Sequence, residues 1–259
     1  MSIPRGLFCN SETSSIQPFW RGQLFLFDRP RAPTYSSREG LKLLLVFLFL
    51  EGVVRPVLSA GARWLAIAQR DWWPLLQASL LTALVCCLVV GFARVHLSRL
   101  GLYSWIHWSK IEKFYFLQIV PITIVVFSFF ESAELKMLWA RPHLWRIGLF
   151  IFVPKMIWGF YQEFLYRGVL QTELVRRWGP WMGILVSTLI FTFGPLHAYH
   201  FRMARANPSH LWIFAAIFAI GLFFAFIFRR SGNLWIVGIL HGLGDWFIDG
   251  LAEVSRMAS

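Results

Sequence analysis

The chain has 259 residues, of which 57% are hydrophobic and only 15% are charged. So few charged side chains cannot cover the surface of a globule of this size, which excludes an ordinary soluble fold. The net charge of +12 does not indicate a nucleic-acid-binding domain, because the Lys and Arg residues are spread through short connections between apolar segments. The composition predicts an all-α, polytopic transmembrane helical bundle.

The apolar segments predict the order of the spans. Residues 1–39 form a polar and aromatic N-terminal tail, without the small-residue cleavage site behind an apolar core that marks a signal peptide. Later runs approach the ~20 residues that a helix needs to cross a bilayer. We expect about seven spans, at residues 40–61, 73–96, 113–131, 145–172, 181–199, 210–229 and 233–251. Residues 40–144 would hold three accessory helices, residues 145–251 a functional core, and residues 252–259 a C-terminal tail.

The distribution of Lys and Arg predicts the orientation in the membrane. With a cytoplasmic N-terminus, the connections on the cytoplasmic side carry 14 of these residues and those on the other side carry 8. We therefore expect the N-terminus in the cytoplasm and the C-terminus outside, in a prokaryotic plasma membrane. The cysteines Cys9, Cys86 and Cys87 have no metal-binding or redox spacing, and we interpret them as structural.

Ionisable residues inside three of the spans are the candidates for function, because a charged group at mid-bilayer costs at least ~2.5–3.5 kcal/mol. Glu163 and Arg167 in the fourth span are four residues apart, so they share one face of a helix. His241 and Asp245 in the seventh span share a face in the same way, and the carboxylate can fix the tautomer of the imidazole. The fifth span ends near His197.

Each of these features also has a structural interpretation. A Glu–Arg pair at this spacing is a common brace, and the first span carries Glu51 and Arg55 in the same arrangement with no histidine motif near them in the sequence. We interpret that pair as a packing or topology device. His197 beside His200 could lie at the membrane interface. The co-occurrence of carboxylates and histidines in three spans favours a shared site, because all of them have to avoid lipid.

Three motifs carry a family resemblance. They are the segment from Gln162 to Arg167, the segment from Phe193 to His197, and the segment from His241 to Asp245. Their order resembles that of the intramembrane glutamic endopeptidases, which include the type II CAAX prenyl proteases and the bacterial Abi or CPBP proteins. The pattern of that family is Glu-Glu-x-x-x-Arg, then Phe-x-x-x-His, then His-x-x-x-Asn or Asp. The resemblance covers roughly residues 145–250.

The resemblance implies an endopeptidase that needs no cofactor and no metal ion. We hypothesise that Glu163 and His197 activate a water molecule, and that His241 donates a hydrogen bond to the oxyanion. Asp245 would orient His241, and Arg167 would hold Glu163. Gln162 stands where the family pattern has its first glutamate, and a neutral amide cannot act as a general base, although it can hydrogen-bond a water or a backbone group.

The expected partners are the lipid bilayer and a substrate cut near its membrane-proximal end, such as a prenylated tail or a leader peptide. Two alternatives stay open. One is a non-catalytic scaffold or binding protein of the same fold, indicated by Gln162. The other is a zinc protease that uses His197, His241 and a carboxylate as ligands. A transporter or channel is disfavoured, because outside the motifs only scattered Ser, Thr and Gln occur in the spans. The sequence does not indicate an oligomeric state.

Overall fold

The computed structural model describes residues 35–256, and within that range every regular element is a helix. The elements in chain order are α1 (Ser37–Phe49), η2 (Leu50–Val54), α2 (Arg55–Trp64), α3 (Trp73–Cys87), η3 (Leu88–Ala93), η4 (Leu97–Leu100), η5 (Trp105–His107), α4 (Lys110–Phe130), α5 (Ser132–Trp139), α6 (Leu144–Ile147), η6 (Gly148–Phe152), α7 (Val153–Glu163), η7 (Phe164–Gln171), α8 (Thr172–Phe193), η8 (Pro195–His197), α9 (Ala198–Ala206), η9 (Pro208–His210), α10 (Leu211–Ser231), α11 (Leu234–Asp245), η10 (Trp246–Gly250) and α12 (Leu251–Arg256).

Local sequence signals explain where several helices begin. Ser36 and Glu39 form a capping box at the start of α1, in which each side chain binds the backbone N–H of the other residue. Ser109 and Glu112 do the same at the start of α4. The helix that ends at Phe193 stops because Gly194 leaves the helical conformation and Pro195 follows it.

Six helical runs are long and apolar enough to cross a membrane, which confirms the predicted polytopic bundle. They are Ser37–Trp64, Trp73–Ala93, Glu112–Phe130, Leu144–Ala206, Pro208–Ser231 and Leu234–Arg256. The run of 63 residues covers the two spans expected at 145–172 and 181–199. Of the tail predicted at residues 1–39, residues 1–34, with Cys9, lie outside the described residues, and α1 already begins at Ser37. Cys86 and Cys87 are both free thiols.

The longest run is divided into two helices at Gly179. This residue has φ 80° and ψ 170°, a conformation that only glycine adopts readily, and Pro180 follows it. The chain then folds back on itself. The close approach of Gly183 to Val175 shows this, since a Cβ at Gly183 would lie only 2.6 Å from the Cα of Val175. The break therefore yields the two separate spans that the sequence predicts. The expected end of the second one at residue 199 is wrong, since the helix stops at Phe193.

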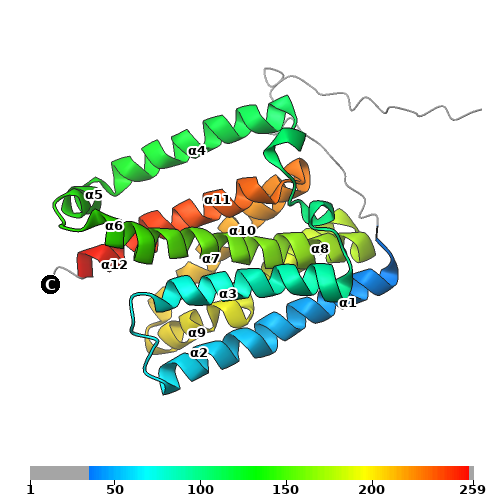
Figure 1. Ribbon diagram of the computed structural model, residues 1–259, viewed down its shortest axis with the longest axis horizontal. Helices are drawn as coiled ribbons and strands as arrows, with labels where there is room; N and C mark the ends of the chain where they lie inside the picture. The colour runs from blue at the N-terminus through cyan, green and yellow to red at the C-terminus, as the bar shows by residue number, and fades with distance from the viewer. Residues whose placement is uncertain (1–34, 257–259) are drawn as a thin grey trace, which may run out of the picture.

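The helices pack in layers around a central pair (Figure 1). Helices α7 and α11 lie against each other in the middle, α3 packs on α7, and α10 packs on α8. Helix α4 runs along one edge of the bundle, and α1 with α2 along the opposite edge. The main hydrophobic core contains residues of α1, α3, η7, α10 and α11. The division into accessory helices and a core at residue 144 stays a prediction, although this hydrophobic core joins both parts.

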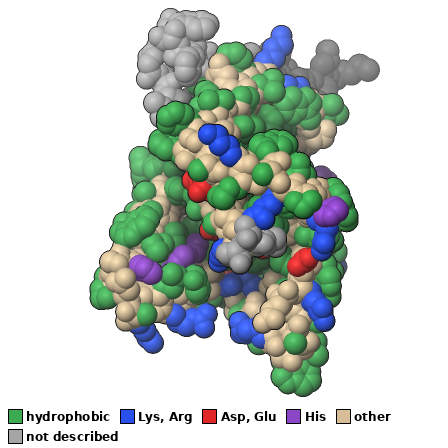
Figure 2. Space-filling view, turned by 90° about the vertical axis from the view of Figure 1, so that its left-hand side faces the viewer, with side chains coloured by type: hydrophobic (Ala, Val, Ile, Leu, Met, Phe, Trp, Pro, Cys, Tyr) green, Lys and Arg blue, Asp and Glu red, His purple; other side chains and the backbone are tan. Residues whose placement is uncertain are grey.

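The outer surface is apolar where a membrane would contact it. Large hydrophobic side chains such as Val125, Phe129 and Trp212 are more than half exposed, and 6% of the residues in the apolar window of the Glu112–Phe130 run are buried. Figure 2 views one end of the bundle and shows hydrophobic side chains over much of its surface, with Lys and Arg in separate patches. This distribution is that of an integral, multi-pass membrane protein.

Candidate active site

The carboxylate of Glu163 joins two of the sequence motifs. Its Oε2 accepts a hydrogen bond from the Nε of Arg167 at 3.1 Å, and its Oε1 accepts one from the Nδ1 of His241 at 2.7 Å. Glu163 and Arg167 are 0% exposed, so the charges are paired away from lipid and water. The structure therefore extends the predicted Glu–Arg pair by a histidine from another span.

His241 lies between two carboxylates. Its Nδ1 faces Glu163, and its Nε2 lies 3.5 Å from the Oδ1 of Asp245, one turn later on the same helix. Because an ionised Glu163 can only accept, the Nδ1 of His241 carries a proton. The side chain of Asp245 is 21% exposed, which makes it the more accessible of the two carboxylates. Asp245 thus lies where it can orient the second nitrogen of the imidazole.

His197 reaches the same region from the short helix η8. Its Nδ1 lies 2.7 Å from the carbonyl oxygen of Phe191, and since a carbonyl only accepts, Nδ1 is the donor. The Nε2 of a neutral His197 then carries the lone pair. The ring stays partly exposed, so this lone pair is available to a water or a ligand.

The ring of Phe191 holds the polar groups together. Its centroid lies 4.9 Å from that of His197 and 6.0 Å from that of His241. The guanidinium of Arg167 stacks 4.9 Å from the same centroid. The two imidazoles therefore contact the same aromatic ring and lie in one region of the bundle. Sequence reasoning missed Phe191, because an aromatic residue in an apolar span gives no signal of its own.

The guanidinium of Arg167 has further hydrogen-bonding capacity. Its Nη1 and Nη2 are buried and make no hydrogen bond within residues 35–256. The cation–π contact with Phe191 offsets part of this cost. Within residues 35–256, the side chain of Arg167 donates its only hydrogen bond to Glu163, as expected for a residue that holds this carboxylate in place.

Gln162 is buried beside Glu163, but its amide makes no hydrogen bond within the described part of the chain. The carboxylate at position 163 is the one that contacts the histidine of α11. The catalytic roles of the two neighbouring positions stay predictions.

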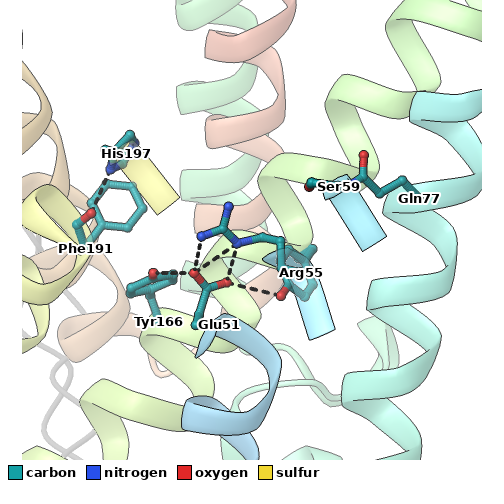
Figure 3. A network of polar contacts seen from close by, with 8 residues as sticks. Glu51, Arg55, Ser59, Gln77, Tyr166, Phe191 and His197 are labelled. Carbon is teal, nitrogen blue, oxygen red and sulfur yellow. Dashed lines mark hydrogen bonds and ion pairs between the residues drawn. The ribbon is translucent and has the colours of Figure 1, made fainter. Parts of the chain in front are cut away.

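Glu51 and Arg55 are far from His197 in sequence, but they lie in the same region of the bundle (Figure 3), where η2 packs against η8. Glu51 is 2% exposed and binds Arg55 through Nε and Nη2, the latter at 2.9 Å. It also accepts hydrogen bonds from Tyr161 at 3.3 Å and Tyr166 at 3.1 Å, which lie on either side of Gln162 and Glu163. The pair is therefore attached to the first motif, a link that no local pattern in the sequence indicates.

Two pockets lie elsewhere in the bundle. One, of about 610 Å³, is lined mainly by residues of the α2–α3 connection, α6, η6 and α12, and the other, of about 200 Å³, extends beside it to Trp158. None of the six candidate residues lines either pocket. That the candidate residues form one active site stays a prediction. Within residues 35–256, no group of three His, Cys, Asp or Glu residues could hold a metal ion.

Comparison with known proteins supports the resemblance. Residues 143–247 match the model of the family described as type II CAAX prenyl endopeptidase Rce1-like. Comparisons with curated proteins and with solved structures gave no match. The matched segment begins just before α6, ends two residues after Asp245, and contains all six candidate residues. Residues 143–247, which are less than half of the chain, are thus similar to the Rce1-like family of type II CAAX prenyl endopeptidases.

Proposed function

We propose that the chain is an intramembrane endopeptidase that hydrolyses a peptide bond near the membrane-proximal end of a protein or peptide. One observation carries this proposal: the buried carboxylate of Glu163 contacts both Arg167 of its own motif and His241 of another span. A structural brace needs only the first contact. Hydrolysis needs a carboxylate and an imidazole held together next to further polar groups.

Water activation falls to Glu163 and His197. Two oxygens of a carboxylate offer about four acceptor positions, so Glu163, although 0% exposed in this structure, keeps acceptor capacity for a water that enters the site, in addition to the hydrogen bonds from Arg167 and His241. The Nε2 of His197 is an acceptor because its Nδ1 donates to the carbonyl of Phe191. The base removes a proton from the water as its oxygen attacks the carbonyl carbon, and the proton passes to the leaving amine when the C–N bond breaks.

The oxyanion that forms during the attack needs a donor. His241, when protonated on both nitrogens, can donate through Nε2 while Nδ1 remains bonded to Glu163. Asp245 keeps this nitrogen in position from 3.5 Å away. Gln162 contributes at most a hydrogen bond, since its amide accepts no proton at neutral pH.

The proposed substrate is a segment that leaves the membrane next to a span, either a prenylated tail or a leader segment. The chain would act in a prokaryotic plasma membrane with its N-terminus in the cytoplasm. The alternative of a non-catalytic scaffold is favoured by one observation, the replacement of the family's first glutamate by Gln162.

Comparative proteomics of membrane fractions tests the proposal. Three strains would be compared: one with the wild-type chain, one without it, and one that carries Glu163→Gln. If the chain is a protease, a set of membrane proteins or peptides changes its terminal mass in both defective strains. Purified wild-type protein in liposomes should then cut synthetic versions of these termini. Unchanged termini in both defective strains would favour the scaffold instead.

A further inference from the structure

Glu51 is a charged group that neither the family match nor the proposed mechanism uses. It lies in η2, outside residues 143–247, and its side chain is almost fully buried. Burial of a carboxylate is costly unless it is paired, and here every polar partner is a donor: Arg55, Tyr161 and Tyr166. A carboxylate with these partners is a fixed acceptor and is poorly suited to act as a base.

The two tyrosines connect Glu51 to the first motif. Tyr161 precedes Gln162 and Glu163 at the end of α7, and Tyr166 follows them in η7. Both hydroxyl groups donate to the same carboxylate, one to each oxygen. This segment changes from an α-helix to a π-helix directly after Glu163, so its local geometry is not fixed by α-helical hydrogen bonds alone. Glu51 therefore clamps the motif on both sides of that change.

A chain of contacts leads from Tyr166 through Phe191 to His197. The ring of Tyr166 packs edge-on against Phe191, with centroids 5.1 Å apart. The carbonyl of Phe191 accepts the Nδ1 proton of His197. In addition, η2 lies against η8, the helix that carries His197, and in Figure 3 Tyr166 lies between Glu51 and Phe191.

We infer that Glu51 is a positioning residue of the active site, which fixes Tyr166 and through it the orientation of Phe191 and His197. This inference rests on the proposed function. It makes the first span part of the catalytic apparatus, although that span carries none of the family motifs. Glu51 touches no reacting atom, so its effect should reach the reaction through His197.

A second buried carboxylate provides a matched control. Glu112 is 0% exposed and is bound by the hydroxyl of Tyr103 and, at 3.3 Å, by the amide of Asn233. Asn233 precedes His241 by eight residues on the chain, ~12 Å along a helix. Glu112→Gln thus removes a buried charge of the same kind from a place that does not contact the motif tyrosines.

The experiment compares wild type, Glu51→Gln, Tyr166→Phe, their double variant and Glu112→Gln in the full-length protein. Two readouts are measured, the steady-state kinetics on a substrate cut by the wild type and the rate at which diethyl pyrocarbonate modifies His197. Peptide mass spectrometry follows the second rate, with the exposed His96 and His107 as internal references. Thermal unfolding reports the stability of each variant.

Glu51→Gln and Tyr166→Phe should each lower kcat about tenfold with KM nearly unchanged, as expected for an effect on the reacting geometry. The double variant should lose little more than either single one, because the two residues act as a unit. The modification rate of His197 should change at least about threefold in each of the two single variants. Glu112→Gln should leave kcat and this rate within about twofold of wild type.

If Glu51→Gln behaves like the control and only lowers the unfolding temperature, with kcat and the modification rate of His197 unchanged, Glu51 is a structural brace and the inference is wrong. If the wild type cuts no substrate, the proposed function is contradicted. The modification rates would still decide whether Glu51 positions His197, so the two failures are distinguishable.

Discussion

Gly159 of α7 and Gly242 of α11 lie in direct backbone contact: a Cβ on Gly159 would be 2.7 Å from the Cα of Gly242. Real Cβ atoms do not approach other atoms this closely, so no larger residue fits without a shift of one helix. Glu163 lies one turn after Gly159, and His241 directly precedes Gly242. The close approach of the two glycines therefore sets the distance between the carboxylate and the imidazole.

Gly159→Ala should push α7 and α11 apart and lower peptidase activity more than it lowers stability. Overpacking of a helix contact costs about 1–3 kcal/mol, and a displacement of about 1 Å at the reacting groups can cost 10²-fold in rate. Gly148→Ala is the matched control, because a Cβ at Gly148 would meet nothing within 4 Å. Equal activity of both variants, measured on the same substrate, would contradict this role of the glycine contact.

Glu163→Gln should abolish proteolysis, by a factor of ~10² or more, because it removes the general base and the charge that pairs with Arg167. Gln162→Ala should do less harm, since its amide holds no partner in the described chain. Gln162→Glu, which restores the pair of the family pattern, should leave activity intact or raise it. The measurement is kcat/KM on one substrate for all three variants.

A different outcome would reassign the site. If the wild type is inactive on every terminal substrate tested and Gln162→Glu alone gains hydrolysis, position 162 is the catalytic one. The natural protein would then be a pseudoprotease that keeps the helical bundle without turnover.

The fold was largely predictable because the membrane imposes its own pattern. Seven apolar runs in the sequence correspond to the six helical runs, and the discrepancy comes from a single break at Gly179. The end of the helix before His197 was misplaced by several residues. Gly194 and Pro195 carried the signal for that end, but the apolar composition of the segment outweighed it in the prediction.

The site was predictable only where it depends on local geometry. The pairs Glu163–Arg167 and His241–Asp245 follow from the period of a helix, and both are present. The bonds from His241 to Glu163 and from Tyr166 to Glu51 join residues 78 and 115 positions apart. Such contacts depend on which helices pack together, and a single sequence contains no information about that. The catalytic roles of these residues stay predictions.

Asp245→Asn should retain more activity than Asp245→Leu. Asparagine keeps a hydrogen-bonding group 3.5 Å from the Nε2 of His241, whereas leucine leaves that nitrogen without a partner. We expect a loss of less than about tenfold in kcat for the first variant and of about 10² for the second. Similar losses in both would show that the charge of Asp245 matters and not its orienting contact.

Peptidase activity should resist metal chelators. Arg167 occupies an oxygen of Glu163, and a guanidinium beside this carboxylate would repel a dication. Activity would be measured after dialysis against 1,10-phenanthroline and again after addition of zinc. Loss of activity that zinc restores would favour the alternative of a zinc protease with His197 and His241 as ligands.

The orientation can be tested with single cysteines and an impermeant maleimide applied to intact cells. In Figure 1, the connection between α3 and α4 lies at the opposite end of the bundle from α12, as an odd number of spans between the start of α1 and the end of α12 requires. The excess of Lys and Arg assigns the end with that connection to the cytoplasm.

Three probes in a background without other cysteines test this assignment: the native Cys9, Ser104→Cys in the connection and Ser259→Cys at the C-terminus. The maleimide should label only Ser259→Cys in intact cells and all three after permeabilisation. Protection of Ser259→Cys together with labelling of Cys9 and Ser104→Cys would mean the reverse orientation. Protection of all three would mean an even number of spans, which is incompatible with two helices separated by the break at Gly179 each crossing the membrane.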